Sequence, residues 1–376
     1  MSEAQTNQAA AEPAPEPRKP STLKRAALIV IAALVVVAGY LLLWPSPIDP
    51  LAYEPPPRTP LEGPLAPNDR LASAELVAVG QVNGPEDVEV DAEGRIFTGT
   101  VDGRVVRVDP DGKLTTIATT GGRPVGIATA PDGNLIVADA VKGLISIDPQ
   151  GKITTLVSDT KATPLGFADD VDVARDGTIY FSDASGKFGE DEYLLDMLEA
   201  RPHGRLLRYD PATRKTTVLL QDLYFANGIA LAENEKFVLV NETYRFRITR
   251  YWLKGDRAGK SDVFIDNLPG FPDNITSNRK GTFWLALFTV RNDAADWLSP
   301  RPFVKGVLAK LPRFLWPKPE PYAFVVKLDE QGKILDSFQD PTGKRLFAVT
   351  SASERDGHLY LGSLLNNRIG KYKLPK

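Results

Sequence analysis

Pairs of polar residues stand just before apolar strands at several places in the sequence, and the clearest pair is Asp273-Asn274 in PGFPDNITSNRKGTFWLAL, residues 269–287. Six segments of the chain share one plan, a short strand, a tight turn and a second strand rich in β-branched and aromatic residues. Counting back eight residues from each turn gives Glu86, Val125, Asp169, Asn227, Asp273 and Val349. The next positions are Asp87, Gly126, Asp170, Gly228, Asn274 and Thr350.

The repeated segments predict an all-β fold. Their turn residues are Gly94, Gly133, Gly177, Glu235, Gly281 and Gly357. Six units of about four strands are typical of a six-bladed β-propeller, which we place at residues 72–376. A β-sandwich or two stacked domains would not need six copies of one unit. The last unit ends early, so we expect residues 72–80 to supply its outer strand and close the ring.

The polar positions should meet, because the first strand of every blade lines the central channel of a propeller. Glu86, Asp169, Asn227 and Asp273 would converge there, with Asp87, Asp170 and Asn274 close behind. Clustered carboxylates cannot all stay ionised without a compensating charge. The chain has no cysteine and two histidines, so an all-oxygen site for Ca²⁺ is favoured, and seven oxygen-bearing side chains would suffice for two ions. The alternative is that these residues only shape turns and cap strands.

Four motifs carry a resemblance to a known family. GPEDVEV, ADDVDVARDGTIYFSDAS, FANGIALAENEKFVLVNETYRFRITRYWL and LPGFPDNITSNRKGTFWLAL resemble the strictosidine synthase-like family, and within it the adipocyte plasma membrane-associated proteins, over residues 75–376. The same superfamily includes paraoxonases and gluconolactonases, which are calcium-dependent hydrolases. The resemblance implies calcium ligands at Glu86, Asp169, Asn227, Asp273 and Asn274, and a second, structural calcium at Asp87 and Asp170.

Three departures from the family pattern limit the reaction. Val125 stands where paraoxonases carry a catalytic His, and Asp169 where relatives usually carry Asn. The last inner strand has Val349, Thr350 and Ser351 in place of a synthase Glu, and we expect Glu354 nearer the turn and exposed. We therefore expect a calcium-dependent hydrolase of small apolar lactones or aryl esters, with Asp169 or Asp273 as proton acceptor. The alternative is a non-enzymatic propeller that holds a structural calcium and binds a ligand or a protein. A C–N bond-forming synthase is disfavoured.

The N-terminal region has the pattern of a membrane anchor. We expect a disordered cytoplasmic tail at residues 1–25, a transmembrane helix at Ala26–Trp44 and a Pro-rich spacer at residues 45–71. Basic residues precede the apolar run and none follows before Arg58. This asymmetry predicts a cytoplasmic N-terminus and a propeller on the periplasmic or other extracytoplasmic side. A cleaved signal peptide is the alternative.

Two insertions interrupt the blade rhythm, at residues 189–204 and 291–322, and we expect them to form a helical cap over the channel mouth. The second carries six basic and three acidic residues, which suits an anionic membrane surface, with simple packing on the blades as the alternative. His203 lies beside a turn and His358 on a surface strand. No Gly-x-Ser-x-Gly motif occurs, and the net charge of −3 argues against a nucleic-acid partner.

Overall fold

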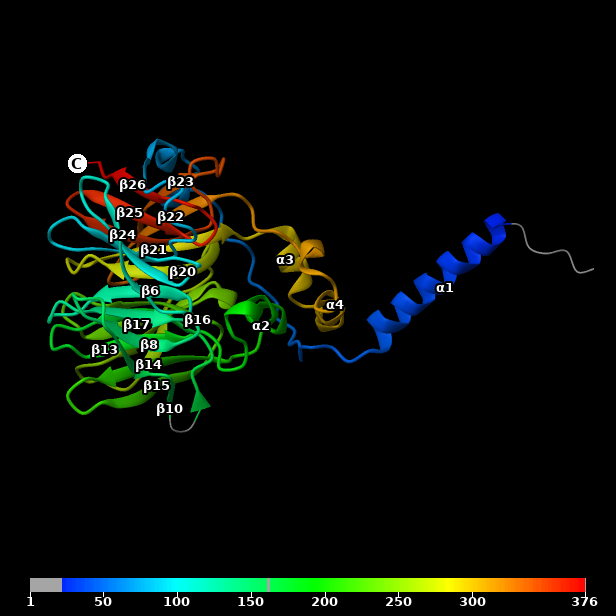
Figure 1. Cartoon of the computed structure of the whole chain (residues 1–376), viewed down its shortest axis with the longest axis horizontal. Coiled ribbons are helices and arrows are strands. Elements are labelled where there is room, and N and C mark those ends of the chain that lie inside the picture. Colours follow the sequence, from blue (N-terminus) through cyan, green and yellow to red (C-terminus); the bar gives the residue numbers. More distant parts are fainter. Residues whose placement is uncertain (1–21, 161–162, 376) are drawn as a thin grey trace, which may run out of the picture. The chain divides into compact units, whose positions relative to one another are not determined.

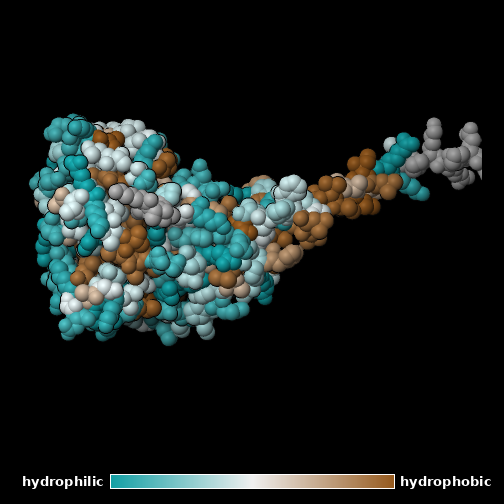
Figure 2. Space-filling view, turned by 90° about the horizontal axis from the view of Figure 1, so that it is seen from below, coloured by the Kyte–Doolittle hydropathy of each residue, from teal (hydrophilic) through white to brown (hydrophobic). Residues whose placement is uncertain are grey.

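The computed structural model describes residues 22–160 and 163–375, in two separate compact units, Met1–Ser46 and Pro47–Lys376. The tail predicted at residues 1–25 lies almost wholly outside the described residues. In the first unit, the helix α1 (Thr22–Leu43) is long and apolar enough to cross a membrane. Figure 2 shows apolar side chains along α1 and hydrophilic ones at its N-terminal end.

The second unit is the predicted six-bladed propeller, with four antiparallel strands in each blade (Figure 1). Blade 1 has β2 (Val88–Val90), β3 (Ile96–Gly99), β4 (Arg104–Val108) and β5 (Leu114–Thr119), and blade 2 has β6 (Pro124–Thr129), β7 (Leu135–Asp139), β8 (Gly143–Ile147) and β9 (Ile153–Val157). Blade 3 has β12 (Ala168–Val173), β13 (Ile179–Asp183), β14 (Gly204–Asp210) and β15 (Lys215–Leu223), and blade 4 has β16 (Ala226–Leu231), β17 (Phe237–Glu242), β18 (Arg247–Trp252) and β19 (Ser261–Ile265). Blade 5 has β20 (Gly270–Ser277), β21 (Thr282–Val290), β22 (Ala323–Asp329) and β23 (Ile334–Asp340).

Blade 6 is closed by the N-terminal strand, as predicted. Its own strands are β24 (Val349–Arg355), β25 (His358–Ser363) and β26 (Ile369–Lys373). The fourth strand is β1 (Glu75–Val77), which pairs antiparallel with β26 at the outer edge. Strands from both ends of the propeller sequence therefore share one sheet, and this pairing closes the ring.

The six predicted turns share one backbone conformation. The five glycines have φ between 70° and 84°, and Glu235 has a φ of 54°. A positive φ of this size costs glycine little and other residues more, so five of the six turns use glycine. The turn positions, and with them the register of every inner strand, are thereby confirmed.

The remaining elements are short. Near the channel mouth lie η3 (Glu190–Glu192), α2 (Tyr193–Glu199), η4 (Thr243–Arg245), α3 (Asp293–Leu298), α4 (Pro302–Leu308) and η5 (Arg313–Leu315), and β10 (Asp159–Thr160) pairs with β11 (Thr163–Pro164). In the second insertion, the helix α4 ends at Leu308, and its Phe303 is 67 % exposed. The predicted cap is therefore several short helices whose buried sides meet in one cluster around Leu298 and Trp316.

The Pro-rich segment after α1 lies on the propeller unit instead of forming a free spacer. Ile48 is buried in the cap cluster with Leu298 and Trp316. Further along, the backbone N–H of Tyr53 donates to the Ser299 carbonyl. The segment then forms η1 (Gly63–Leu65) and η2 (Arg70–Ser73). An extended Pro-rich chain keeps its carbonyls and apolar rings available for such contacts, which explains why composition alone suggested a spacer.

Candidate metal centre

The six positions counted back from the turns, Glu86, Val125, Asp169, Asn227, Asp273 and Val349, form what we call the ring. In five of the inner strands, a β-bulge lies at the ring position. The strand registers shift between Pro124 and Gly126, Ala168 and Val171, Ala226 and Ile229, Pro272 and Ile275, and Val349 and Ser351. In blade 1, Glu86 and Asp87 stand just before β2 begins at Val88. A bulge releases residues from the ladder and re-aims their side chains, which is how the strands present these residues to the channel.

The structure brings the five predicted ligands together as a buried group. Asn274 donates its Nδ2 to Glu86 Oε1 and Oε2, at 3.1 and 3.2 Å. The side chains of Asn227 and Glu86 lie near the Asp273 carboxyl group, and both lower its pKa against the larger effect of burial. All five side chains, including Asp169, belong to residues that are at most 7 % exposed.

The carboxylates in this group resist ionisation. Burial, followed by the negative charge of Asp273, raises the pKa of Glu86 well above its usual range. The same two causes raise the pKa of Asp169. Burial raises the pKa of Asp273 to about 8. Acidic side chains with such pKa values need either protons or a nearby cation at neutral pH.

Unpartnered oxygens point to a cation. Asp169 Oδ2, Asn227 Oδ1 and Asn274 Oδ1 are buried and have no hydrogen-bond partner. Buried polar atoms are normally hydrogen-bonded. Three buried oxygens without a hydrogen-bond partner in one place therefore indicate a ligand that oxygen atoms can coordinate. The donor set of carboxylate and amide oxygens is the set that Ca²⁺ prefers. The residues present therefore fit a calcium ion.

The group is not yet arranged as a metal cage. Within residues 22–160 and 163–375, no three His, Cys, Asp or Glu side chains stand close enough together to hold a metal ion. Two of the five ligands are Asn, and Asn274 turns its NH₂ group toward Glu86. Rotation of that amide would exchange the NH₂ for the unpartnered Oδ1.

The second residues of two pairs already have partners. Asp87 accepts the backbone N–H of Val88 at 2.8 Å and that of Ile127, in the next blade, at 3.0 Å. Asp170 accepts the N–H of Val171 and that of Ile229, in blade 4, both at 2.7 Å. Both carboxylates thus join neighbouring blades. Each carboxylate oxygen has a further lone pair, so a second metal at Asp87 and Asp170 stays a prediction.

Arg123 is a neighbour of the ring that the sequence did not reveal. Its side chain is buried, and it donates from Nη2 to the Gly84 carbonyl at 3.0 Å. Its positive charge opposes the rise in the Asp169 pKa, and burial lowers the pKa of Arg123 itself. Its position two residues before Val125 was the only available signal, and a single Arg near a strand start is too common to be informative.

Apolar residues cover the cap side of the ring. Val125 is buried with Phe167, Phe225 and Tyr244, and Tyr193 of α2 packs against them. Tyr244 donates its hydroxyl to the Tyr193 carbonyl at 3.2 Å. A substrate that reaches the ring from the cap side must therefore pass an aromatic wall under α2.

The opposite half of the channel is a polar cavity of about 400 Å³ that begins at Asp87 and Asp170 and extends to Glu354 and Arg355. Glu354, which we expected to be exposed, is half-buried and accepts Trp284 Nε1 at 2.7 Å and Asn278 Nδ2 at 3.0 Å. The wrong expectation came from its closeness to the turn, because the inner strand continues into the channel as far as Arg355.

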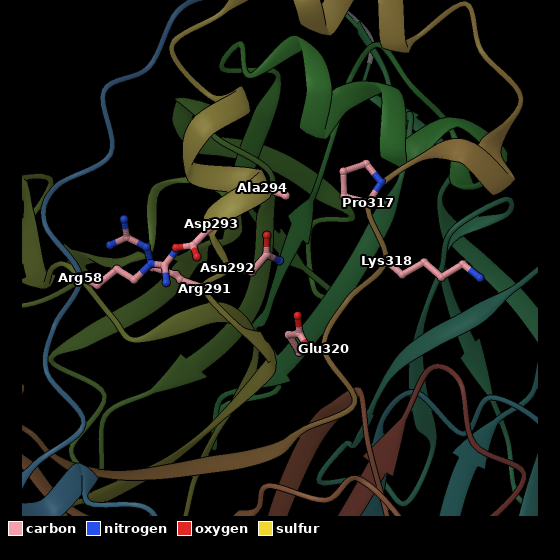
Figure 3. Close-up of a pocket in the computed structure, with 8 residues that line it drawn as sticks. All are labelled: Arg58, Arg291, Asn292, Asp293, Ala294, Pro317, Lys318 and Glu320. Atoms are coloured by element: carbon pink, nitrogen blue, oxygen red, sulfur yellow. The ribbon is translucent and has the colours of Figure 1, made fainter.

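A second hollow, of about 420 Å³, lies at the base of the cap insertion and is lined by none of the five predicted ligands (Figure 3). It is lined by Arg58, Arg291, Asn292, Asp293, Ala294, Pro317, Lys318 and Glu320. Arg58 pairs with Asp293 and Asp296 at 2.7 Å each, so its charge is already neutralised. This hollow shows no chemistry of its own.

Neither histidine belongs to the ring. His203 Nε2 lies 2.7 Å from Glu199 Oε1, at the end of α2. His358 Nδ1 contacts the Asp356 carbonyl at 3.0 Å on the surface. A mechanism at the ring must therefore rely on carboxylates and not on imidazole.

Comparison with solved structures identifies the class of propeller. A gluconolactonase from Xanthomonas campestris superposes with a TM-score of 0.59 at 19% identity, covering 89% of this chain and 99% of that one. A calcium-binding regucalcin from Agrobacterium tumefaciens gives a TM-score of 0.55 at 14% identity, covering 80% of this chain and 93% of that one. At these identities the likeness shows the fold alone, the six-bladed propeller.

Sequence comparison gives the family. The strictosidine synthase model matches residues 169–256, and the model of the strictosidine synthase-like N-terminal region matches residues 63–108. The adipocyte plasma membrane-associated protein of Rattus norvegicus is 38% identical, covering 92% of this chain and 98% of that protein. The strictosidine synthase-like 3 protein of Arabidopsis thaliana is 33% identical, covering 81% of this chain and 86% of that protein. The chain belongs to the strictosidine synthase-like family, with the adipocyte plasma membrane-associated proteins among its relatives.

Proposed function

We propose that the chain is a membrane-anchored, calcium-dependent hydrolase of lactones or aryl esters. The observation that carries this proposal is the set of three unpartnered buried oxygens, on Asp169, Asn227 and Asn274, among carboxylates with raised pKa values. Fold neighbours that are described as a gluconolactonase and a calcium-binding protein support it. The apolar helix α1 and the membrane-associated relatives support the anchor. The basic residues that precede the apolar run favour a cytoplasmic N-terminus and an extracytoplasmic propeller.

Glu86, Asp169, Asn227, Asp273 and Asn274 would hold the ion. Bound calcium supplies a Lewis acid for the carbonyl oxygen of an ester or lactone. Asn227 and Asn274 are neutral and limit the negative charge of the site, while Arg123 offsets part of the charge of Asp169. The apolar wall of Val125, Phe167, Phe225 and Tyr244 excludes water from the cap side and favours an apolar acyl or aryl group.

The proton transfer falls to a carboxylate, because no imidazole reaches the ring. Asp169 or Asp273 takes a proton from the attacking water as the water oxygen bonds to the carbonyl carbon, and the proton then passes to the leaving oxygen.

The test is hydrolysis of a panel of aryl esters and lactones by the full chain in detergent, with calcium and with excess chelator. We expect turnover that disappears with chelator and returns with calcium. Asp273→Asn should lower calcium affinity and turnover by about tenfold or more, since losing a charged partner costs about 1.5–3 kcal/mol. The matched control is Asp256→Asn, at an exposed position between β18 and β19. Equal turnover with calcium and with chelator would sink the proposal.

A non-enzymatic binding propeller is the second candidate, favoured by Val125 at the position of the paraoxonase His and by the closed aromatic wall. In that case calcium would raise the melting temperature of the full chain, and none of the panel would be hydrolysed. The same samples therefore distinguish the two functions.

A further inference from the structure

The cap carries exposed aromatic side chains that the blades lack. Trp297, Phe303 and Phe314 are 54 %, 67 % and 74 % exposed, and Leu315 is 54 % exposed. In the described part of residues 47–376, the other large apolar side chains with such exposure are all aliphatic and lie far apart in the sequence. Exposed aromatic residues gathered in 19 residues of sequence mark an interaction surface.

These residues surround one small packed unit. Their neighbours in the sequence, Leu298, Val304 and Trp316, pack into the cap cluster. Trp297, Phe303 and Leu315 are each adjacent to one of these, so buried and exposed apolar side chains alternate around the same cluster. The cap is therefore held rigidly from inside and presents its remaining apolar side chains outward.

The cap also carries excess positive charge. Residues 291–322 contain six basic and three acidic residues, a net charge of +3. Arg301 stacks on Trp297 with its guanidinium 4.4 Å from the ring centroid, and Lys318 is exposed. Aromatic rings beside basic side chains are typical of segments that sit at the headgroup level of an anionic bilayer.

Chain connectivity selects a lipid bilayer over other apolar partners. Ile48, which is buried in the cap cluster, comes five residues after Leu43, the last residue of α1. Five extended residues reach at most about 17 Å, whatever direction α1 takes. A bilayer that holds α1 would therefore be within reach of the cap.

We propose that the cap surface formed by Trp297, Phe303, Phe314 and Leu315 rests on the bilayer that holds α1, with the basic residues of the cap at the headgroups. This surface is separate from the metal centre, and the proposal holds whether or not the propeller is an enzyme. Contact with lipid would place the channel mouth where membrane-dissolved molecules are concentrated.

The absence of cysteine makes the test direct, because single-cysteine variants can be labelled in the full chain. Phe303→Cys and Phe314→Cys carry bimane on the cap. Gln331→Cys is the control, in the turn between β22 and β23, at the end of β22 that is far from the cap insertion. The proteins are reconstituted in phosphatidylcholine vesicles, with and without phosphatidylglycerol, that contain nitroxide-labelled phosphatidylcholine. We expect loss of bimane fluorescence at both cap positions, stronger with phosphatidylglycerol, and none at position 331.

Anchoring through α1 could bring the cap near the lipid even if the aromatic side chains did not insert. A second variant distinguishes this anchoring from contact through the aromatic side chains. Leu315→Cys is labelled with and without Phe303→Asp and Phe314→Asp, whose exposed positions let the fold survive. Reduced quenching in the charged variant supports contact through the aromatic side chains. The proposal is overturned if the cap labels are quenched no more than the label at 331, or if the charged variant is quenched as strongly as its parent.

Discussion

At the scale of single residues, adjacent acidic side chains have different tasks. Asp87 and Asp170 give both oxygens to backbone N–H groups of their own and a neighbouring blade. Glu86 and Asp169, one position earlier, are left without backbone partners of this kind, and Asp169 Oδ2 has none at all. The pairs therefore combine a structural carboxylate with one that stays available for an ion.

A buried carboxyl group outside the ring gives a pH-dependent prediction. Asp196 of α2 is fully buried, accepts the Ser185 hydroxyl and has its pKa raised by burial to about 7 from 3.8. A raised pKa stabilises the fold below pH 3.8, and this contribution is lost as the pH rises through about 7. The difference corresponds to at most about 4 kcal/mol.

Asp196→Asn removes the ionisation and can still accept the Ser185 hydroxyl. Since the Asp196 carboxyl group ionises above about pH 3.8 in the unfolded chain but only above about pH 7 in the fold, we expect the variant to melt at a higher temperature than the parent at pH 5, and by a larger margin at pH 8, in thermal scans of the full chain in detergent. A variant less stable than its parent at pH 8 would show that the charge of Asp196 is compensated in the fold.

At the scale of elements, glycines allow neighbouring inner strands to approach at the ring. A Cβ on Gly126 would lie 2.6 Å from the Asp169 carbonyl oxygen and from Asp170 Cα. A Cβ on Gly228 would lie 2.5 Å from Ile275 N and 2.6 Å from the Asp273 carbonyl oxygen. These contacts are with backbone, which cannot move aside cheaply, so the ring depends on glycine at both positions.

We expect Gly228→Ala to lower the free energy of unfolding by about 1–3 kcal/mol or more, because the added methyl group forces two strands apart. Gly189→Ala is the matched control, since its nearest neighbour atom would be 3.9 Å from the new Cβ. Denaturant titration of both variants gives the comparison. Equal stability of the two would mean that the inner strands can separate without cost.

The sequence predicted the strands better than the segments that connect them. Turn glycines at a constant eight-residue offset from Glu86, Asp169 and Asp273 determine register, because a positive φ is a local requirement that leaves a direct mark in the sequence. The same offsets identified the ring residues, which the structure brings together. The bulges left no comparable mark, since they arise from packing between blades.

The cap and the Pro-rich segment were less predictable, for a different reason. Ile48 and Tyr53 are fixed by contacts with residues about 150 or more positions away, such as Leu298 and Ser299. Glu354 lines the polar channel cavity, where its carboxylate accepts a hydrogen bond from Trp284 Nε1 of the neighbouring blade. Long-range contacts of this kind depend on how the blades are assembled, and no local pattern in the sequence encodes them.

At the scale of the whole molecule, the propeller is closed by a short strand and by the residues that precede it. The strand β1 has three residues, which pair with β26. Leu71 in η2 is fully buried with Trp284 and Phe338 of blade 5 and Leu361 of blade 6. Closure therefore depends on apolar packing just before β1 as much as on three residues of strand pairing.

Leu71→Ala tests this closure. Truncating a fully buried Leu costs about 2–5 kcal/mol, and we expect that loss in the free energy of unfolding. Because β1 follows Leu71 closely, the amide protons of β26 should also exchange faster in the variant. Leu365→Ala is the matched control, since Leu365 is 49 % exposed and its truncation should change stability by less than about 0.5 kcal/mol. The contrary outcome is that stability falls in Leu71→Ala while the amide protons of β26 exchange as slowly as before. In that case η2 would stabilise blades 5 and 6 without holding β1, and the propeller would be closed by strand pairing alone.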